Sequence, residues 1–434
     1  MVMRKIYDFL IGRAVNSRDL VVIPFFLLSL LIFCNLNGIF NSVFGINALG
    51  SPLILLCCLV ILFLVPTQFS DFNTSISLFI AFLLAFLIMG WVSGLMANYN
   101  PQFEINAAIK STREIVTGII ILITYYVYAR WSTLNLSRDF IIQLVFGFFL
   151  FTLLVGVFED LLGLREILYL NYDNSRHLGF FGNPNETGMQ ANLTLVLCFY
   201  LYLRERIGKV ITIILMLLCI YGALSSVSKL AIILNAVLIF LFVSYLVIRS
   251  FRSHQRKRAE GFKFILLLGI IIAILVRLVA IPYWNQLDTM QQKRITAISQ
   301  LVFKGEFTNK TTSLRAGLFK DAIHKIKEKP IMGYGLSTFS KGGLLQSSPS
   351  HGVHNMYLKI AGEAGLVTAL IFVLILLFYS YNALFKMSSP LGFIYLCFIV
   401  SYALYAFASH NVFGQKFIIG LMGILLTFNN GSNE

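Results

Sequence analysis

Two histidines and an asparagine stand directly before a membrane-length apolar segment. In the stretch SHGVHNMYLKIAGEAGLVTALIFVLILLF, residues 350–378, these are His351, His354 and Asn355. An imidazole with an ordinary pKa of about 6.5 can accept a proton at neutral pH, so His354 is a candidate general base. The alternatives are structural, because a histidine at a helix start is often simply hydrogen-bonded and asparagine is a preferred helix cap.

Arg315 is a candidate anion-binding residue. It lies in TTSLRAGLFKDAIHKIKEKPIMGYG, residues 311–335, whose apolar residues recur at i, i+3 and i+4 and predict an amphipathic helix. Thr311, Thr312 or Ser313 can cap this helix, and Pro330, Gly333 and Gly335 end it. A cation in the first turn opposes the helix dipole, whereas a phosphate would meet both the guanidinium and the helix amides. A salt bridge to Asp321 or another nearby acid is the alternative.

Two further cations lie next to predicted spans. Arg176 belongs to SRHLGFFGNPNETG, residues 175–188, where GNPN is typical of a turn before a helix. Lys229 belongs to SSVSKLAIIL, residues 225–234, at the end of a span. A cation at the membrane edge suggests function because burying it uncompensated costs several kcal/mol. For both residues the alternative is a side chain that extends to the lipid headgroups.

Neither a metal nor another cofactor is expected. The HGVH spacing places two histidines at i and i+3, but no cysteine or carboxylate before Glu363 supplies a third ligand. The chain has no Gly-rich phosphate loop, and the segment before His354 has no paired acidic motif, so a nucleotide-sugar mechanism lacks support. The six cysteines all lie inside apolar runs, which indicates small buried or lipid-facing side chains.

Composition sets the class of protein. The 434 residues are 58% hydrophobic and 12% charged, whereas soluble domains carry about 25% charged residues. Apolar runs of membrane-spanning length predict an all-α polytopic membrane protein. Twelve transmembrane helices are expected, at about 20–36, 51–67, 74–95, 114–130, 140–162, 186–203, 208–224, 228–248, 262–282, 360–385, 389–408 and 413–428.

Basic residues orient these spans. Four of them precede the first span, and the basic segments RERIGK (204–209) and RSFRSHQRKRAEGFK (249–263) fall on the same side. Short basic loops stay in the cytoplasm, so both termini are expected there. The large loop 283–359, between the ninth and tenth helices, is then periplasmic, although it is basic, because loops beyond about 60 residues translocate regardless of charge. Residues 1–434 are thus predicted to form one transmembrane domain with this loop inserted.

Three motifs resemble those of bacterial O-antigen ligases and the related O-antigen polymerases. HNMYLKIAGEAGL matches the family's His-Asn, nine residues, then Gly, here His354, Asn355 and Gly365. SLRAGLFKDAIHKIKEKPIMGYGLSTF resembles its Arg-helix-Pro-x-x-Gly-x-Gly segment, and RHLGFFGNPNETG its Arg-x-x-Gly-x-Phe-x-Asn-Pro-Asn motif. Lys229 departs from the pattern, because the family commonly has arginine after the preceding serine. Lysine keeps the positive charge but cannot make the bidentate contacts of a guanidinium group.

The resemblance implies a metal-independent, inverting glycosyltransferase of lipopolysaccharide biosynthesis in the bacterial inner membrane. Its donor would be a glycan on undecaprenyl pyrophosphate at the periplasmic face, in contact with membrane lipids and without nucleic acid. Arg176, Lys229 and Arg315 would hold the pyrophosphate and stabilise the charge that develops on it. His354 would take the proton of the acceptor hydroxyl, and Asn355 would orient His354 or cap the helix.

Three functions remain open. A ligase would use lipid A-core as acceptor and is favoured by the His-Asn spacing, whereas a polymerase would use a second lipid-linked glycan. A transporter or flippase is the third. It should show Gly- or Pro-broken helices and midmembrane charges, but the charges here gather on one predicted face.

The topology can be tested with single added cysteines. Lys341→Cys should react with a membrane-impermeant maleimide on the periplasmic side, and Arg256→Cys should not, because short basic loops are retained in the cytoplasm. Labelling is compared with that of the chain without an added cysteine. Reaction at position 256 but not at 341 would invert every span.

Overall fold

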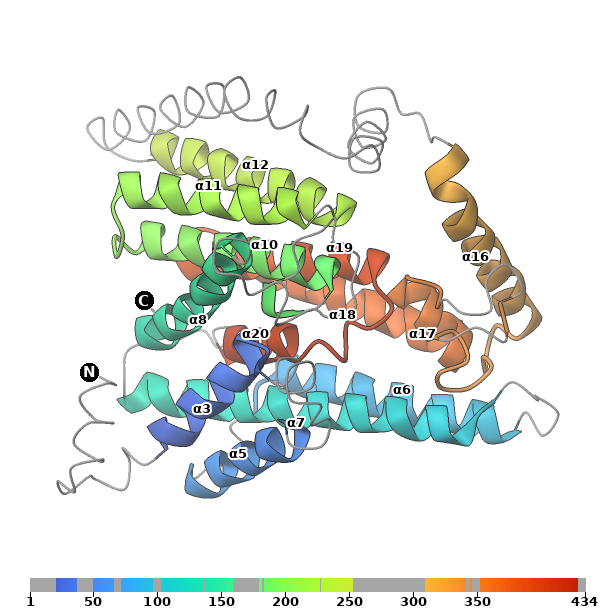
Figure 1. Ribbon diagram of the computed structural model, residues 1–434. Helices are drawn as coiled ribbons and strands as arrows, with labels where there is room; N and C mark the ends of the chain where they lie inside the picture. Colours follow the sequence, from blue (N-terminus) through green and yellow to red (C-terminus); the bar gives the residue numbers. More distant parts are fainter. Residues whose placement is uncertain are drawn as a thin grey trace. The chain divides into compact units, whose positions relative to one another are not determined.

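The computed structural model describes the larger part of the chain, and the described residues are helical, with no strand among them (Figure 1). They form two compact units. Unit 1 comprises Met1–Phe151, Gly317–Tyr379 and Ala406–Glu434, and unit 2 comprises Thr152–Ala316 and Ser380–Tyr405. The described residues are 21–36, 50–65, 72–96, 103–135, 138–158, 179–181, 183–226, 228–252, 309–340, 344–345 and 352–427.

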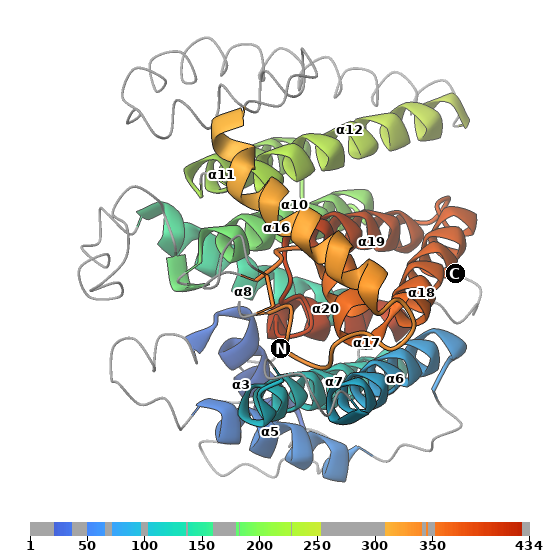
Figure 2. The ribbon, with the colours of Figure 1, turned by 90° about the vertical axis from the view of Figure 1, so that its right-hand side faces the viewer.

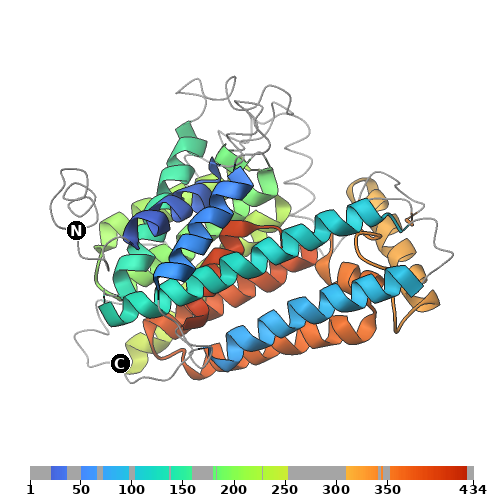
Figure 3. The same cartoon turned by 90° about the horizontal axis from the view of Figure 1, so that it is seen from below.

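Unit 1 is built around α7 (Ile105–Asn135) and the C-terminal helix α20 (Lys416–Leu426). α20 comes close to α7 because Gly423 has no side chain; a Cβ there would lie 2.6 Å from the Leu122 carbonyl oxygen. α3 (Val22–Phe33) and α5 (Gly50–Leu64) complete this core, and Phe33 stacks edge-on against Tyr125 at 5.3 Å. The long helix α6 (Thr74–Met96) runs beside α7 (Figure 3). α8 (Arg138–Phe158) also contributes its first part to this unit.

The central helix of unit 2 is α10 (Pro184–Leu203), which packs against α11 (Lys209–Ser225) and α12 (Lys229–Arg252) (Figure 1). Asn183 caps α10 by accepting from the Asn185 amide at 3.0 Å, so the NPN part of the predicted turn starts the helix as expected. Polar residues of α10 are buried but paired: Asn192 donates to the Ala231 carbonyl and accepts from Asn235, both at 3.0 Å. Unpaired, such amides would cost several kcal/mol in an apolar interior. α19 (Pro390–Ala408) contributes its residues up to Tyr405 to this unit.

The helices agree with most of the predicted spans. Within the described residues, six helices are long and apolar enough to cross a membrane: Thr74–Met96, Ile105–Ser132, Asp139–Phe158, Lys229–Phe251, Leu366–Phe385 and Pro390–Ala408. The other predicted spans coincide with α3, α5, α10, α11 and α20, except 262–282, which lies outside the described residues. The total of twelve, the orientation and the periplasmic position of 283–359 stay predictions.

The amphipathic helix predicted in the long loop is present as α16 (Asn309–Glu328), but its start differs. It begins before Thr311, so the predicted cap at Thr311, Thr312 or Ser313 is wrong. Arg315 is consequently the seventh residue of the helix and not in its first turn. The dipole falls off within the first turn, so the argument that pairs Arg315 with the free helix amides no longer holds.

The predicted tenth span, 360–385, is two helices and not one. α17 (Met356–Ala364) ends at Gly365, and α18 (Leu366–Phe385) begins directly after it. Gly365 has φ 88° and ψ 162°, a conformation that essentially only glycine adopts. A Cβ at this position would lie 1.8 Å from the carbonyl oxygen of Ile331. The break therefore comes from a chain segment that packs against the helix, which hydrophobicity alone does not reveal.

Replacing Gly365 by alanine tests this close approach. We expect Gly365→Ala to lower the free energy of unfolding by about 1–3 kcal/mol, the cost of a sparsely populated backbone conformation, and more through the overlap with Ile331. The matched control is Gly147→Ala in α8, where a Cβ meets nothing within 4 Å. Thermal unfolding of both variants in detergent gives the answer, and equal midpoints would contradict the packing.

Candidate functional site

Residues 330–340 form a segment that follows α16 and packs against the end of α17. The Tyr334 amide donates to the Gly362 carbonyl at 2.8 Å, and the Gly335 amide donates to the Glu363 carbonyl at 3.0 Å. The Leu366 amide donates to the Pro330 carbonyl at 2.7 Å. The 330–340 segment thus pairs carbonyls that a helix end otherwise leaves free.

The opposite side of the 330–340 segment lies against α6, which also contacts α17 (Figure 2). The Leu336 amide donates to the Gly90 carbonyl at 3.1 Å, and the Ser93 hydroxyl donates to the Met332 carbonyl. Gly335 has φ 103°, and a Cβ there would lie 2.6 Å from the Gly94 Cα. The glycines of the Pro-x-x-Gly-x-Gly pattern are therefore needed for close backbone packing.

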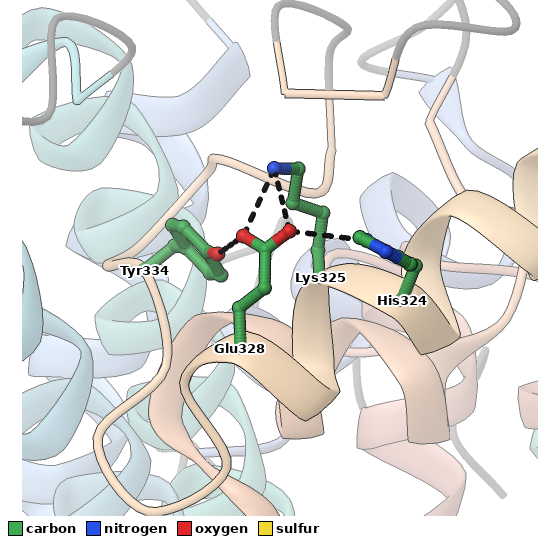
Figure 4. Close-up of polar contacts among 4 residues, drawn as sticks. All are labelled: His324, Lys325, Glu328 and Tyr334. Carbon is green, nitrogen blue, oxygen red and sulfur yellow. Dashed lines mark hydrogen bonds and ion pairs between the residues drawn. The ribbon is translucent and has the colours of Figure 1, made fainter.

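Tyr334 also fastens the end of α16 to this segment (Figure 4). Its hydroxyl donates to the carboxylate of Glu328, which is paired with Lys325 at 2.9 Å and with His324 at 3.0 Å. The hydrogen bond from Tyr334 and then that from Lys325 lower the pKa of Glu328 below its ordinary value. Lys325, near this end of α16, thus has a structural partner in the same helix.

Glu363 connects the 330–340 segment to the backbone directly before His354. Its side chain is fully buried, and Oε1 accepts from the Phe339 amide at 3.2 Å and the Ser340 hydroxyl at 3.1 Å. The Phe339 carbonyl in turn accepts from the Val353 amide at 3.1 Å, directly before His354. Burial raises the pKa of Glu363, although its hydrogen bonds and Lys359 oppose the shift. The buried carboxyl of Glu363 therefore helps to fix the backbone that leads into His354.

His354 stands immediately before the start of α17 and is half-buried. Its φ of 47° lies in the left-handed region, where histidine is several-fold enriched among non-glycine residues. Asn355 is the N-cap of α17, and its Oδ1 accepts from the Leu358 amide at 3.0 Å. Asn355 is therefore a helix cap, which is one of its two predicted roles. This cap fixes the backbone next to His354.

His410 is a neighbour of His354 that sequence reasoning missed. It lies between α19 and α20, and the two imidazole centroids are 4.9 Å apart with their planes at 72°. Burial, then Lys359 and His354, lower the pKa of His410 to about 3, so this ring is neutral at physiological pH. The signal was available, since the predicted topology already put the 409–412 connection on the same face as His354.

The other predicted site residues lie elsewhere in the chain. Lys229 is the first residue of α12 in unit 2, where the Ser228 hydroxyl accepts from the Ala231 amide at 3.4 Å. Arg315 lies in the part of α16 whose side chains are outside the described residues, and Arg176 and His351 are outside them altogether. Of the predicted set, the structure brings together His354 and Asn355. Among the described residues, no three His, Cys, Asp or Glu side chains gather as metal ligands.

Comparison with known proteins supports the resemblance seen in the motifs. Residues 211–373 match the model of a family described as O-antigen ligase. This region contains α11, α12, α16, the 330–340 segment, His354 and α17. No curated protein sequence matches the chain.

The raised pKa of Glu363 predicts a pH-dependent stability. A carboxyl whose pKa is higher in the fold than in the unfolded chain stabilises fully below the unfolded value, and this contribution is lost as pH rises through the folded value. Glu363→Gln keeps an acceptor for Phe339 and Ser340 without a charge. We therefore expect the thermal-unfolding midpoint of Glu363→Gln to increase relative to that of the wild type as pH rises from about 4.5.

The control for this measurement is Glu328→Gln, whose parent carboxyl is exposed and has a lowered pKa. Removing this charge should give no such gain at higher pH. A constant difference between Glu363→Gln and the wild type across the pH range would show that the buried carboxyl does not titrate on unfolding.

Proposed function

We propose, from the match of residues 211–373 to the O-antigen ligase family, that this chain is a membrane glycosyltransferase of the ligase type. It would move a glycan from undecaprenyl pyrophosphate to a sugar hydroxyl of lipid A-core, at the periplasmic face of the inner membrane. The observation that carries this proposal is the position of His354. A half-exposed imidazole is fixed at the start of α17 by the cap at Asn355 and by the 330–340 segment.

His354 would act as the general base. The acceptor hydroxyl gives its proton to the imidazole while its oxygen attacks the anomeric carbon, and the bond to the pyrophosphate oxygen breaks on the opposite side. One in-line displacement inverts the anomeric configuration. Pyrophosphate is a good leaving group as an anion, so the step needs neither a metal nor a general acid. A positioned base of this kind contributes about 10²–10⁴-fold to the rate.

The pyrophosphate would be held by Arg176, Lys229 and Arg315. Lys229 supports this role because it is a cation at the N-terminal end of α12, where the helix dipole disfavours it by about 0.3–1 kcal/mol and favours an anion. Arg315 would act through its guanidinium fork on phosphate oxygens, without help from the helix amides. The three cations would stabilise the charge that grows on the leaving oxygen.

The alternative function is a polymerase that extends a lipid-linked repeat unit. Both enzymes use the same donor and the same base, so the acceptor distinguishes them. Membranes that contain the protein are supplied with labelled lipid-linked glycan and either lipid A-core or unlabelled lipid-linked repeat units. Label on lipid A-core supports the ligase, and longer lipid-linked chains support the polymerase. A flippase would produce neither product.

The role of His354 as base is tested by substitution. His354→Ala should lower transfer about 10²–10⁴-fold while protein abundance and donor binding are kept, because Asn355 caps α17 and the 330–340 segment is bonded to α17 through backbone groups. Transfer is measured in membranes and abundance by immunoblot.

His351→Ala is the matched control and should keep substantial activity. The rate of the wild type should also fall as the imidazole of His354 becomes protonated, below about pH 6–7. Normal transfer by a well-expressed His354→Ala protein would remove the base from the mechanism and leave catalysis to the cations.

A further inference from the structure

α17 carries a buried polar stripe, and the proposed reaction uses only its first residue, the cap Asn355. Asn355, Lys359 and Glu363 follow one another at i, i+4 and i+8, on one face of the helix. They are only 3%, 8% and 0% exposed. Asn355 caps the helix and Glu363 holds the 330–340 segment. Lys359 lies between them, and its aliphatic stem is largely covered by the protein.

Lys359 acts on its surroundings through charge. It interacts electrostatically with Glu363 and with His410. Among the described residues, no hydrogen bond or ion pair is formed by its ammonium group. A cation that acts on a neighbouring imidazole can influence which form of the histidine pair is favoured.

His410 packs against the backbone that leads into His354. Gly352 makes room for it, because a Cβ there would lie 3.0 Å from His410 Nε2 and 2.4 Å from the Ser340 carbonyl oxygen. Its Nδ1 is buried and has no hydrogen-bond partner among the described residues. The ring instead packs edge to face with His354, at 4.9 Å between centroids. His410 is thus the wall that limits how the His354 ring can turn.

We propose that His410 and Lys359 are positioning residues for His354: the His410 ring fixes the orientation of the His354 imidazole, and the Lys359 ammonium disfavours a proton on the histidine pair. This proposal rests on the proposed role of His354 as base. The charged groups that act on His410 are Lys359 on α17 and His354 before it. Its own connection, 409–415, contains no other titratable residue. The Lys359 ammonium thereby keeps His354 unprotonated at neutral pH, so that it can take the proton of the acceptor hydroxyl.

The effect of Lys359 can be measured without transfer activity. Diethyl pyrocarbonate modifies unprotonated imidazoles, so the pH dependence of His354 modification in the purified full-length protein, read by peptide mass spectrometry, reports its protonation. Lys359→Met removes the charge and should move the midpoint up by roughly one pH unit. Lys359→Arg keeps the charge and should keep the midpoint. His324, which is 75% exposed on α16, serves as internal reference.

An unshifted His354 midpoint in folded Lys359→Met protein would overturn the role of Lys359. Should that variant not accumulate, Lys359→Gln carries the same test. If the midpoint shifts but His354→Ala still transfers glycan, the histidine arrangement stands and the proposed function fails, so the two outcomes are distinguishable. If both hold, the acid limb of the transfer rate should shift with the modification midpoint.

The wall formed by His410 is tested by a pair of variants. His410→Ala leaves the His354 ring free to turn and should lower kcat by about tenfold to a hundredfold, with little change in KM. His410→Phe restores an aromatic wall without a titratable group and should recover most of this loss. A Phe variant as slow as the Ala variant, or an Ala variant as fast as the wild type, would refute the orientation by His410.

Discussion

The junction between α17 and α18 depends on the backbone hydrogen bonds that the 330–340 segment makes with it. A helix that ends inside a packed protein exposes carbonyls that water cannot reach, and each unpaired group costs about 1–3 kcal/mol. The amides of Tyr334 and Gly335 pair the carbonyls of Gly362 and Glu363, and Pro330 accepts from Leu366 in return. The break in the apolar run is stable because the segment completes these bonds, and His354 takes its place from the same packing.

α17 carries two buried charged residues, Glu363 and Lys359. His410, on which Lys359 acts, is half-buried, and burial disfavours the charged forms of Glu363 and His410. Structural interiors normally avoid such groups, and clusters with shifted pKa values are typical of functional sites. The cost in stability is offset by the hydrogen bonds of Glu363 to Phe339 and Ser340. A fixed imidazole in a fixed electrostatic environment is what a general base requires.

Unit 2 satisfies its buried polar groups in a different way. Asn192 and Asn235 pair with each other across α10 and α12, and Gln190 donates to Thr152 at 2.8 Å. Helices in an apolar surrounding associate through small residues and such amide hydrogen bonds. They hold the start of α12, and with it Lys229, by packing and capping. The cation proposed to meet the pyrophosphate therefore stands on a well-defined helix start.

The sequence by itself determined the class of protein, most helix positions and the identity of the candidate base. These follow from local physics: apolar length for helices, Asn183 and Asn355 as caps, and an imidazole beside a membrane-length run. What only the tertiary structure decided depends on residues distant along the chain. The break at Gly365 follows from the approach of Ile331, and the partner of His354 is His410. The start of α16 at Asn309 was missed because Asn favours caps and the following threonines are weak helix formers, whereas helix ends are set by the whole fold. A periodic pattern records which face of a helix is apolar, but not which distant backbone packs against it.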